Sequence, residues 1–220
     1  MKIAFDFQFI YRNIDSFVWG FIKTLEISLL AILLALVAGF IIALLRMSKQ
    51  PWLSLPAGGI IEFIRNTPLL IQIYVIFFGL FTVGIDFSAF MCGIIALGLH
   101  YTTYMAEVYR AGVESVSRTQ REAAAALGFN RMQTMRLVIL PQAVANIIPP
   151  AFNEFIAMIQ GSSLVSAIGV MELTQTAKMF SERTAATYES FFLISALYLV
   201  LNSILTTGSR FLENRLTAYR

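Results

Sequence analysis

Charged residues are absent from four long stretches of the chain. Runs without Asp, Glu, Lys or Arg cover residues 27–45, 66–85, 87–106 and 190–209. About 20 helical residues, rising roughly 1.5 Å each, cross a hydrocarbon layer about 30 Å thick. A fifth apolar stretch, 137–171, is interrupted only by Glu154. The pattern predicts five membrane spans, near 17–45, 57–82, 88–111, 136–160 and 187–211.

The predicted spans are helices, because backbone polar groups in lipid must pair internally and no alternating strand pattern occurs. We therefore predict an all-α membrane protein: an external segment over 1–16, then one transmembrane domain over 17–220. Pro149 and Pro150 predict a kink in the fourth span, and Gly161 predicts a break. Two arrangements remain open for this span: a helix followed by a loop, or a helix followed by a re-entrant piece.

Composition supports lipid as the main solvent of this surface. Hydrophobic residues make up 58% of the 220 positions and charged residues 13%, whereas a soluble domain carries about 25% charged residues. One histidine and one cysteine exclude a multi-histidine metal site and an internal disulfide. No phosphate-binding GxxxxGK[ST] sequence is present. We expect no cofactor, no resident metal and no nucleic-acid partner.

The basic residues are distributed unequally between the two sides of the predicted bundle. Eleven of the sixteen belong to one side, including Arg46, Lys49, Arg110 and the arginines of the 112–135 loop. This excess marks the cytoplasmic side. We therefore predict an external N-terminus, a cytoplasmic C-terminus and a cytoplasmic loop over 112–135.

The cytoplasmic loop contains a short alanine-rich segment, Arg121–Leu127, which favours a helix. Gly128 can end such a helix by adopting a positive φ. A second helix is expected to begin near Gln133, with Pro141 one turn inside it. Taken alone, this segment is equally compatible with a plain amphipathic connector.

Its spacing resembles the EAA loop of ABC importer permeases. Glu122-Ala123-Ala124, three residues, Gly128, nine residues and then Val138-Ile139-Leu140-Pro141 carry the resemblance. The stretches Thr24–Leu29, Phe63–Gln72, Tyr104–Glu107 and Asn153–Leu173 resemble the polar amino-acid branch of that family.

The resemblance implies a five-helix permease subunit of a type I ABC importer for polar amino acids. Such a subunit pairs with a second permease chain, identical or related, in the lipid of a bacterial cytoplasmic membrane. Two ATP-binding subunits lie on the cytoplasmic side and hydrolyse the ATP, and an extracytoplasmic binding protein delivers the amino acid. The residues implied to couple the chain to the ATPase are Glu122, Ala123, Ala124, Ala126, Leu127 and Gly128.

Polar residues inside the predicted spans are candidates for a substrate pathway, because an ionisable group in the membrane must face protein or water. His100 and Glu107, seven residues apart, share a helix face, with Tyr104 on or beside it. Hydrogen bonding between helices is the alternative role for such groups. The complete candidate set is His100, Tyr104, Glu107, Asn153, Glu154, Gln160, Ser162 and Ser163.

Two further features bear on the pathway. Arg65, Thr67 and Pro68 form either a gate or hinge, or a simple boundary at which Pro68 begins an apolar helix. Gln160-Gly161 stands where the family often has Lys-Asp, so substrate assignments that depend on that pair do not carry over.

An ion-coupled secondary amino-acid transporter is the alternative function. Five spans without an inverted repeat argue against it, because many such carriers consist of paired repeats. A membrane enzyme is less favoured, since no nucleophile–base pair is evident in the sequence. The sequence leaves the carried amino acid undetermined.

Overall fold

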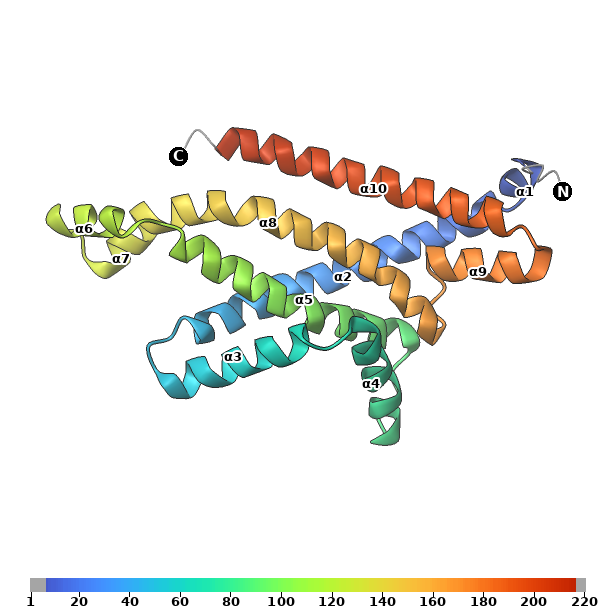
Figure 1. Ribbon diagram of the computed structural model, residues 1–220, viewed down its shortest axis with the longest axis horizontal. Helices are drawn as coiled ribbons and strands as arrows, with labels where there is room; N and C mark the ends of the chain where they lie inside the picture. The colour runs from blue at the N-terminus through green and yellow to red at the C-terminus, as the bar shows by residue number, and fades with distance from the viewer. Residues whose placement is uncertain (1–6, 217–220) are drawn as a thin grey trace.

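The structure, a computed structural model, describes residues 7–216, and every regular element within that range is helical (Figure 1). In chain order the elements are α1 (Phe7–Arg12), α2 (Ile14–Arg46), α3 (Pro51–Arg65), α4 (Leu69–Thr82), α5 (Ala89–Glu114), α6 (Arg118–Ala126), α7 (Arg131–Gln133), the π-helix η1 (Thr134–Ile139), α8 (Leu140–Gly161), the 3-10 helix η2 (Ser162–Ile168), α9 (Leu173–Thr184) and α10 (Thr187–Leu216).

Four of the helical segments described are long and apolar enough to cross a membrane, and a bent helix pair makes a possible fifth. The four are α2, α5, the continuous segment Arg131–Ile168 and α10. The predicted all-α class is therefore confirmed. Of the predicted external segment, 1–6 lie outside the described residues, and the rest begins with α1.

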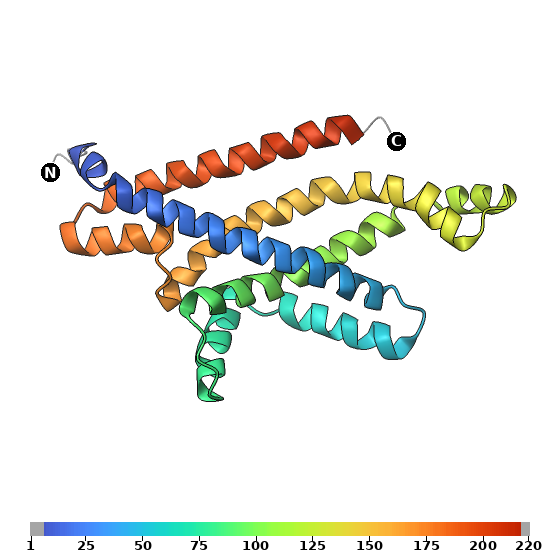
Figure 2. The same cartoon turned by 180° about the vertical axis from the view of Figure 1, so that it is seen from behind.

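The span predicted over 57–82 is divided at Pro68, which begins the second of two helices. Helices α3 and α4 occupy this region, bent by 103° across the break at 66–68. Pro68 stands at the N-cap of α4 with an extended backbone, and it lacks the N–H that a continuous helix would need there. Figures 1 and 2 show α4 projecting sideways from the bundle.

The α-helix of the fourth span ends at Gly161, where the sequence predicts a break, and a 3-10 helix follows it. Helix α8 contains Pro149 and Pro150 and continues directly into η2, which ends at Gly169 with a φ of +82°. A π-helix precedes α8, so the regular α-helix begins at Leu140 rather than at 136.

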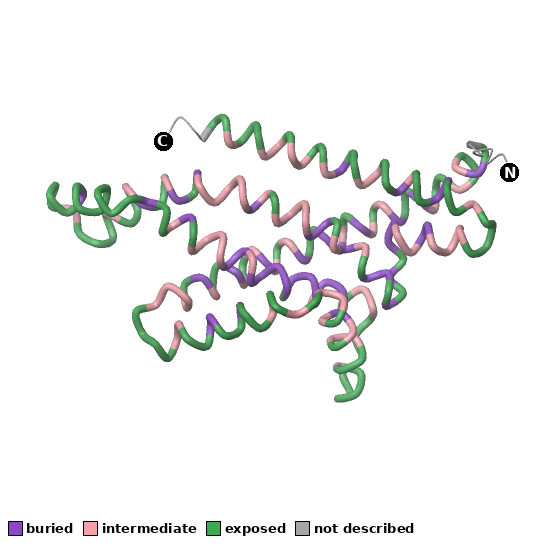
Figure 3. The backbone as a smooth tube through the Cα atoms, in the orientation of Figure 1, coloured by how far each residue is buried: buried purple, intermediate pink, exposed green. Residues whose placement is uncertain are grey.

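Helix α5 forms the centre of the molecule. Two thirds (67%) of its most apolar window is buried, compared with 6% for α10. Figure 3 shows buried positions gathered where α2, α5 and α8 meet and exposed ones along α10. Helix α10 therefore offers its apolar surface to lipid or to another chain.

Small residues allow α2 and α5 to approach closely. Ala31, Ala35 and Ala43 are buried with Gly39 on one face of α2. A Cβ at Gly39 would lie 2.8 Å from the Met105 Cβ and 3.0 Å from the carbonyl oxygen of Thr102. The stripe of small residues thus packs inside this chain.

The two ends of the bundle carry different elements. Helix α6 and the C-terminal end of α10 lie at one end, and α1 and α9 lie at the other (Figures 1 and 2). At the α9 end, Glu172 is fully buried and caps α9, accepting hydrogen bonds from the backbone N–H groups of Thr174 and Gln175 at 2.8 Å. Burial raises the pKa of the Glu172 carboxyl, and these hydrogen bonds oppose that effect.

Candidate functional site

The segment between α5 and α8 forms a short helix that projects beyond the spans. Ser117 caps the start of α6, its side chain accepting from the N–H of Gln120. At the other end, Gly128 has a φ of +80°. Its N–H donates to the Ala125 carbonyl and that of Phe129 to the Ala124 carbonyl, both at 3.0 Å. This is a Schellman motif, so the predicted helix stop at Gly128 is confirmed.

Helix α6 is attached to the bundle on one side only. Ala124 is 2% exposed, whereas Leu127 is 75% exposed. Glu122, Ala123, Ala126 and Gly128 are also exposed. Of the six residues implied to couple to an ATPase, five can therefore contact another protein, and Ala124 packs within this chain instead.

Several contacts tie α6 to the adjoining spans. The Arg121 guanidinium donates to the Val113 carbonyl in the last turn of α5, at 3.0 Å. Val116, Ile139 and Ala143 form a small buried cluster between the end of α5 and the beginning of α8. A force on α6 would thus reach α5 through Arg121, and would reach α8 through η1, against which α6 packs.

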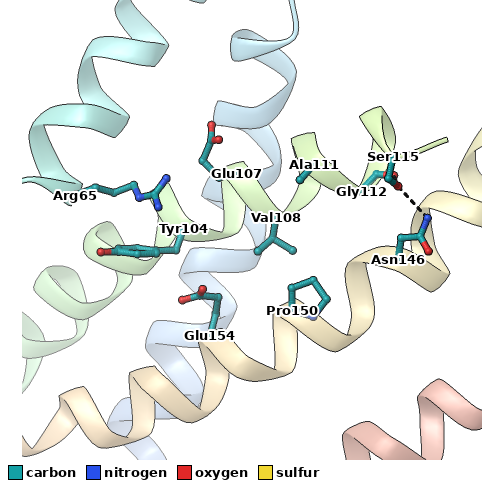
Figure 4. A pocket seen from close by; sticks show the side chains of 10 residues that line it. All are labelled: Arg65, Tyr104, Glu107, Val108, Ala111, Gly112, Ser115, Asn146, Pro150 and Glu154. Atoms are coloured by element: carbon teal, nitrogen blue, oxygen red, sulfur yellow. Dashed lines mark hydrogen bonds between the residues drawn. The ribbon is translucent and has the colours of Figure 1, made fainter. Parts of the chain in front are cut away.

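A pocket of about 410 Å³ lies between α3, α5 and α8 near the same end of the bundle (Figure 4). Charged groups of both signs line it together with small and apolar residues. The lining comprises Arg65, Tyr104, Glu107, Val108, Ala111, Gly112, Ser115, Asn146, Pro150 and Glu154.

The charged groups of the pocket differ in their partners. The Arg65 guanidinium lies 4.8 Å from the centre of the Tyr104 ring, and Figure 4 shows Arg65 and Glu154 on opposite sides of that ring in this view. Glu107 is bonded to Arg110 at 2.7 Å, and Arg110 also binds Glu114. Arg65 and Glu154 are thus the charges placed to meet a ligand.

The pocket brings together only part of the predicted pathway. Tyr104, Glu107 and Glu154 line it, and so does Arg65 from the predicted gate. Asn153, Gln160 and Ser163 are outside the lining, as is Ser162, whose hydroxyl donates to the Ile159 carbonyl. Their assignment to the pathway stays a prediction.

His100 also lies outside the pocket lining, although it shares a helix face with Glu107. Its Nδ1 lies 3.0 Å from the Gln72 Oε1 of α4. Thr67 and Pro68 belong to the bend between α3 and α4, where the Thr67 hydroxyl donates to the Phe63 and Ile64 carbonyls. The sequence assigns no role to Gln72 or to Asn146, because the partners His100 and Ser115 lie 28 and 31 positions away.

Comparison with known proteins identifies the family. Residues 31–218 match the model of the family described as binding-protein-dependent transport system inner membrane component. The chain belongs to this family. As such a permease subunit it is not itself an enzyme, and ATP hydrolysis lies in a separate subunit.

Two relatives and one solved structure cover nearly the whole chain. It is 34% identical to the probable glutamine ABC transporter permease protein GlnM of Bacillus subtilis (strain 168), over 94% of this chain and 96% of that one. It is 35% identical to the octopine transport system permease protein OccM of Rhizobium radiobacter, over 96% and 90%.

The solved structure is a crystal structure of an amino acid ABC transporter with histidines. It is 37% identical to this chain with a TM-score of 0.92, covering 97% of this chain and all of that one. These comparisons confirm the ABC importer permease class and do not support an ion-coupled secondary transporter.

Proposed function

We propose that the chain forms the membrane pathway of an ATP-driven amino-acid importer and that α6 is the contact through which ATP drives it. The observation that carries this proposal is the shape of α6. It is a nine-residue helix that carries three of the five exposed candidate coupling residues, with the other two at its C-terminal end. It follows α5 after a short link and packs against η1, which continues into α8. Relatives named as glutamine and octopine permeases support amino acids and their derivatives as the substrate class.

The proposed complex has two ATP-binding subunits beneath two permease chains, identical or related. A binding protein delivers substrate at the end that carries α9, which faces outward, together with the N-terminus. The end that carries α6 and the C-terminus faces the cytoplasm of a bacterium. The many arginines near α6 support this orientation, because basic residues are retained on the cytoplasmic side.

Transport follows from a difference in affinity. ATP shifts the complex between inward- and outward-facing states only if it binds one state more tightly than the other. Closure of the ATPase pair would carry α6 with it, and the contacts of Arg121 and Val116 would transmit this movement to α5 and α8.

The pocket is proposed as the place where the amino acid passes. An amino acid carries an α-carboxylate and an α-ammonium group at neutral pH. Arg65 is placed to bind the carboxylate and Glu154 the ammonium group, through charge-assisted hydrogen bonds. The remaining lining adds small and polar groups, with Asn146 donating to Ser115 at 2.8 Å.

Photo-crosslinking in cells tests the ATPase contact. A photoreactive residue at Leu127 or Ala123 should capture the ATP-binding subunit, identified by mass spectrometry after purification in mild detergent. The matched control is Leu199 of α10, which is 67% exposed but lies on a spanning helix. Capture of the ATP-binding subunit from Leu199 but not from either α6 position would contradict the proposal.

A further inference from the structure

The bend between α3 and α4 is held by hydrogen bonds to the last turn of α3. In a continuous helix the Ile64 carbonyl would accept from the N–H of residue 68, but Pro68 has none. Instead, this oxygen accepts from the Thr67 N–H at 3.3 Å and from the Thr67 hydroxyl at 3.1 Å. The Gln72 amide Nε2 adds a third hydrogen bond to it, at 2.8 Å. It also contacts the Thr67 carbonyl at 3.1 Å and the Thr67 hydroxyl at 2.7 Å. Gln72, in the first turn of α4, therefore links that helix to three hydrogen-bond acceptors of the bend.

These contacts fix the orientation of the Gln72 amide. The carbonyl oxygens of Ile64 and Thr67 can only accept, so the amide nitrogen must face them. The Gln72 Oε1 then faces the Nδ1 of His100, 3.0 Å away, and His100 must donate the hydrogen from Nδ1. His100 is only 8% exposed and belongs to the central helix α5. The bend is thus hydrogen-bonded to the most buried span.

The same network ends at the pocket. The His100 ring centre lies 5.1 Å from that of Tyr104, and the Arg65 guanidinium lies 4.8 Å from the Tyr104 ring centre. Arg65 is the last residue of α3, immediately before the bend. The direction in which Arg65 leaves the helix therefore depends on how the bend is held.

We propose that Gln72 and His100 are positioning residues that hold the α3–α4 bend so that Arg65 stays over Tyr104 and faces the pocket. Neither lines the pocket itself. The proposal rests on the proposed function in one respect: Arg65 binds the α-carboxylate of the transported amino acid. Through Arg65, the bend determines how tightly that carboxylate is bound.

The geometry of the bend can be measured without substrate. Gly59 of α3 and Gly79 of α4 have open space where a Cβ would be, so spin labels on cysteines at these positions are accommodated. Labelled chain is diluted with unlabelled chain in the complex, and the interspin distance is measured by pulsed electron paramagnetic resonance. Gln72→Met and His100→Phe, which keep the side-chain bulk but remove the hydrogen bonds, should widen the distance distribution.

His100→Asn is the matched control, because its amide can still donate to Gln72. It should give a narrower distribution than His100→Phe. Unchanged distributions in both Gln72→Met and His100→Phe would overturn the proposed role of the two residues.

Transport kinetics test the link to Arg65. Complexes in proteoliposomes receive a mixture of the twenty ¹⁴C-labelled L-amino acids, or ¹⁴C-labelled octopine, and the one accumulated is used afterwards. Arg65→Ala should raise the KM about tenfold or more, since it removes a charge-assisted hydrogen bond. Gln72→Met should raise the KM severalfold with little change in the maximal rate. It should add nothing in an Arg65→Ala background, where the group being positioned is gone.

Failure of the positioning role and failure of the proposed transport function give different results. Equal effects of Gln72→Met with and without Arg65 would overturn the positioning role, while transport itself stands. If the wild-type complex accumulates neither any of the amino acids nor octopine with ATP, the proposed function falls and with it the carboxylate role of Arg65.

Discussion

A single backbone conformation ends the helix proposed to meet the ATPase. Gly128 has a φ of +80°, which an L side chain reaches at a cost of about 1–2 kcal/mol. We expect Gly128→Val to displace the end of α6, so that substrate no longer stimulates ATP hydrolysis in reconstituted complexes. Gly128→Asn should retain more coupling, because asparagine tolerates this conformation.

Gly208→Ala is the control for that experiment, since its position on α10 is open and needs no positive φ. All three variants should insert into the membrane equally, as measured by membrane fractionation. Full uptake with normally stimulated ATP hydrolysis in Gly128→Val would remove α6 from the coupling route.

The negative charge of Glu154 is the subject of a second prediction at the residue scale. Gln at this position keeps the shape and removes the negative charge proposed to meet the α-ammonium group. Uptake by Glu154→Gln should show a KM raised about tenfold, the cost of one charge-assisted hydrogen bond. Glu62→Gln, an exposed change on α3 outside the pocket, should leave the KM unaltered. Equal KM values in the two variants would exclude Glu154 from substrate binding.

At the scale of the element, the close crossing of α2 and α5 limits which side chains position 39 can accommodate. A new Cβ would lie 2.8 Å from the Met105 Cβ, which sits on a rigid helix. We predict that Gly39→Leu lowers the stability of the folded chain by at least about 1–3 kcal/mol, the usual cost of overpacking. Gly59→Ala, on the open face of α3, should leave it unchanged or raise it slightly.

Cys92 supplies the measurement for this prediction. It is a free thiol, 1% exposed inside α5, so a fluorogenic maleimide reacts with it only on unfolding. The unfolding temperature in detergent should fall for Gly39→Leu and not for Gly59→Ala. An unchanged unfolding temperature in Gly39→Leu would mean that α2 and α5 can move apart without loss of stability.

The elements also show how far sequence patterns reach. Charge-free runs predict the spans because the thickness of the hydrocarbon layer fixes their length. Pro68 signals an interruption, but its 103° angle depends on contacts made by Gln72 and His100, residues 28 positions apart. Glu107 and His100 share a face by spacing, yet one pairs with Arg110 and the other with α4. The Glu107 partner lies three residues away on the same helix and follows from spacing. The His100 partner is set by packing between helices, which periodicity does not encode.

At the scale of the whole molecule, the two ends have opposite proposed roles. The α6 end must reach ATP, so it has to lie in the cytoplasm, while the α9 end faces the source of substrate. The arginines near α6 agree with this direction, because basic residues are retained on the cytoplasmic side. Both features depend on one orientation in the membrane, which is open to direct measurement.

Single cysteines on exposed positions of α6 and α9 measure that orientation. Thr119→Cys should react with a membrane-impermeant maleimide only in inside-out vesicles, and Thr184→Cys only in right-side-out vesicles, because both positions are exposed and lie at opposite ends. The wild-type chain is the control, since its buried Cys92 should react in neither preparation. Labelling of Thr119→Cys from outside would separate α6 from cytoplasmic ATP and contradict its coupling role, whatever the behaviour of the pocket. Labelling of both positions from one side would instead mean that the number of crossings between α6 and α9 is even, and α8 with η2 would then not span the membrane.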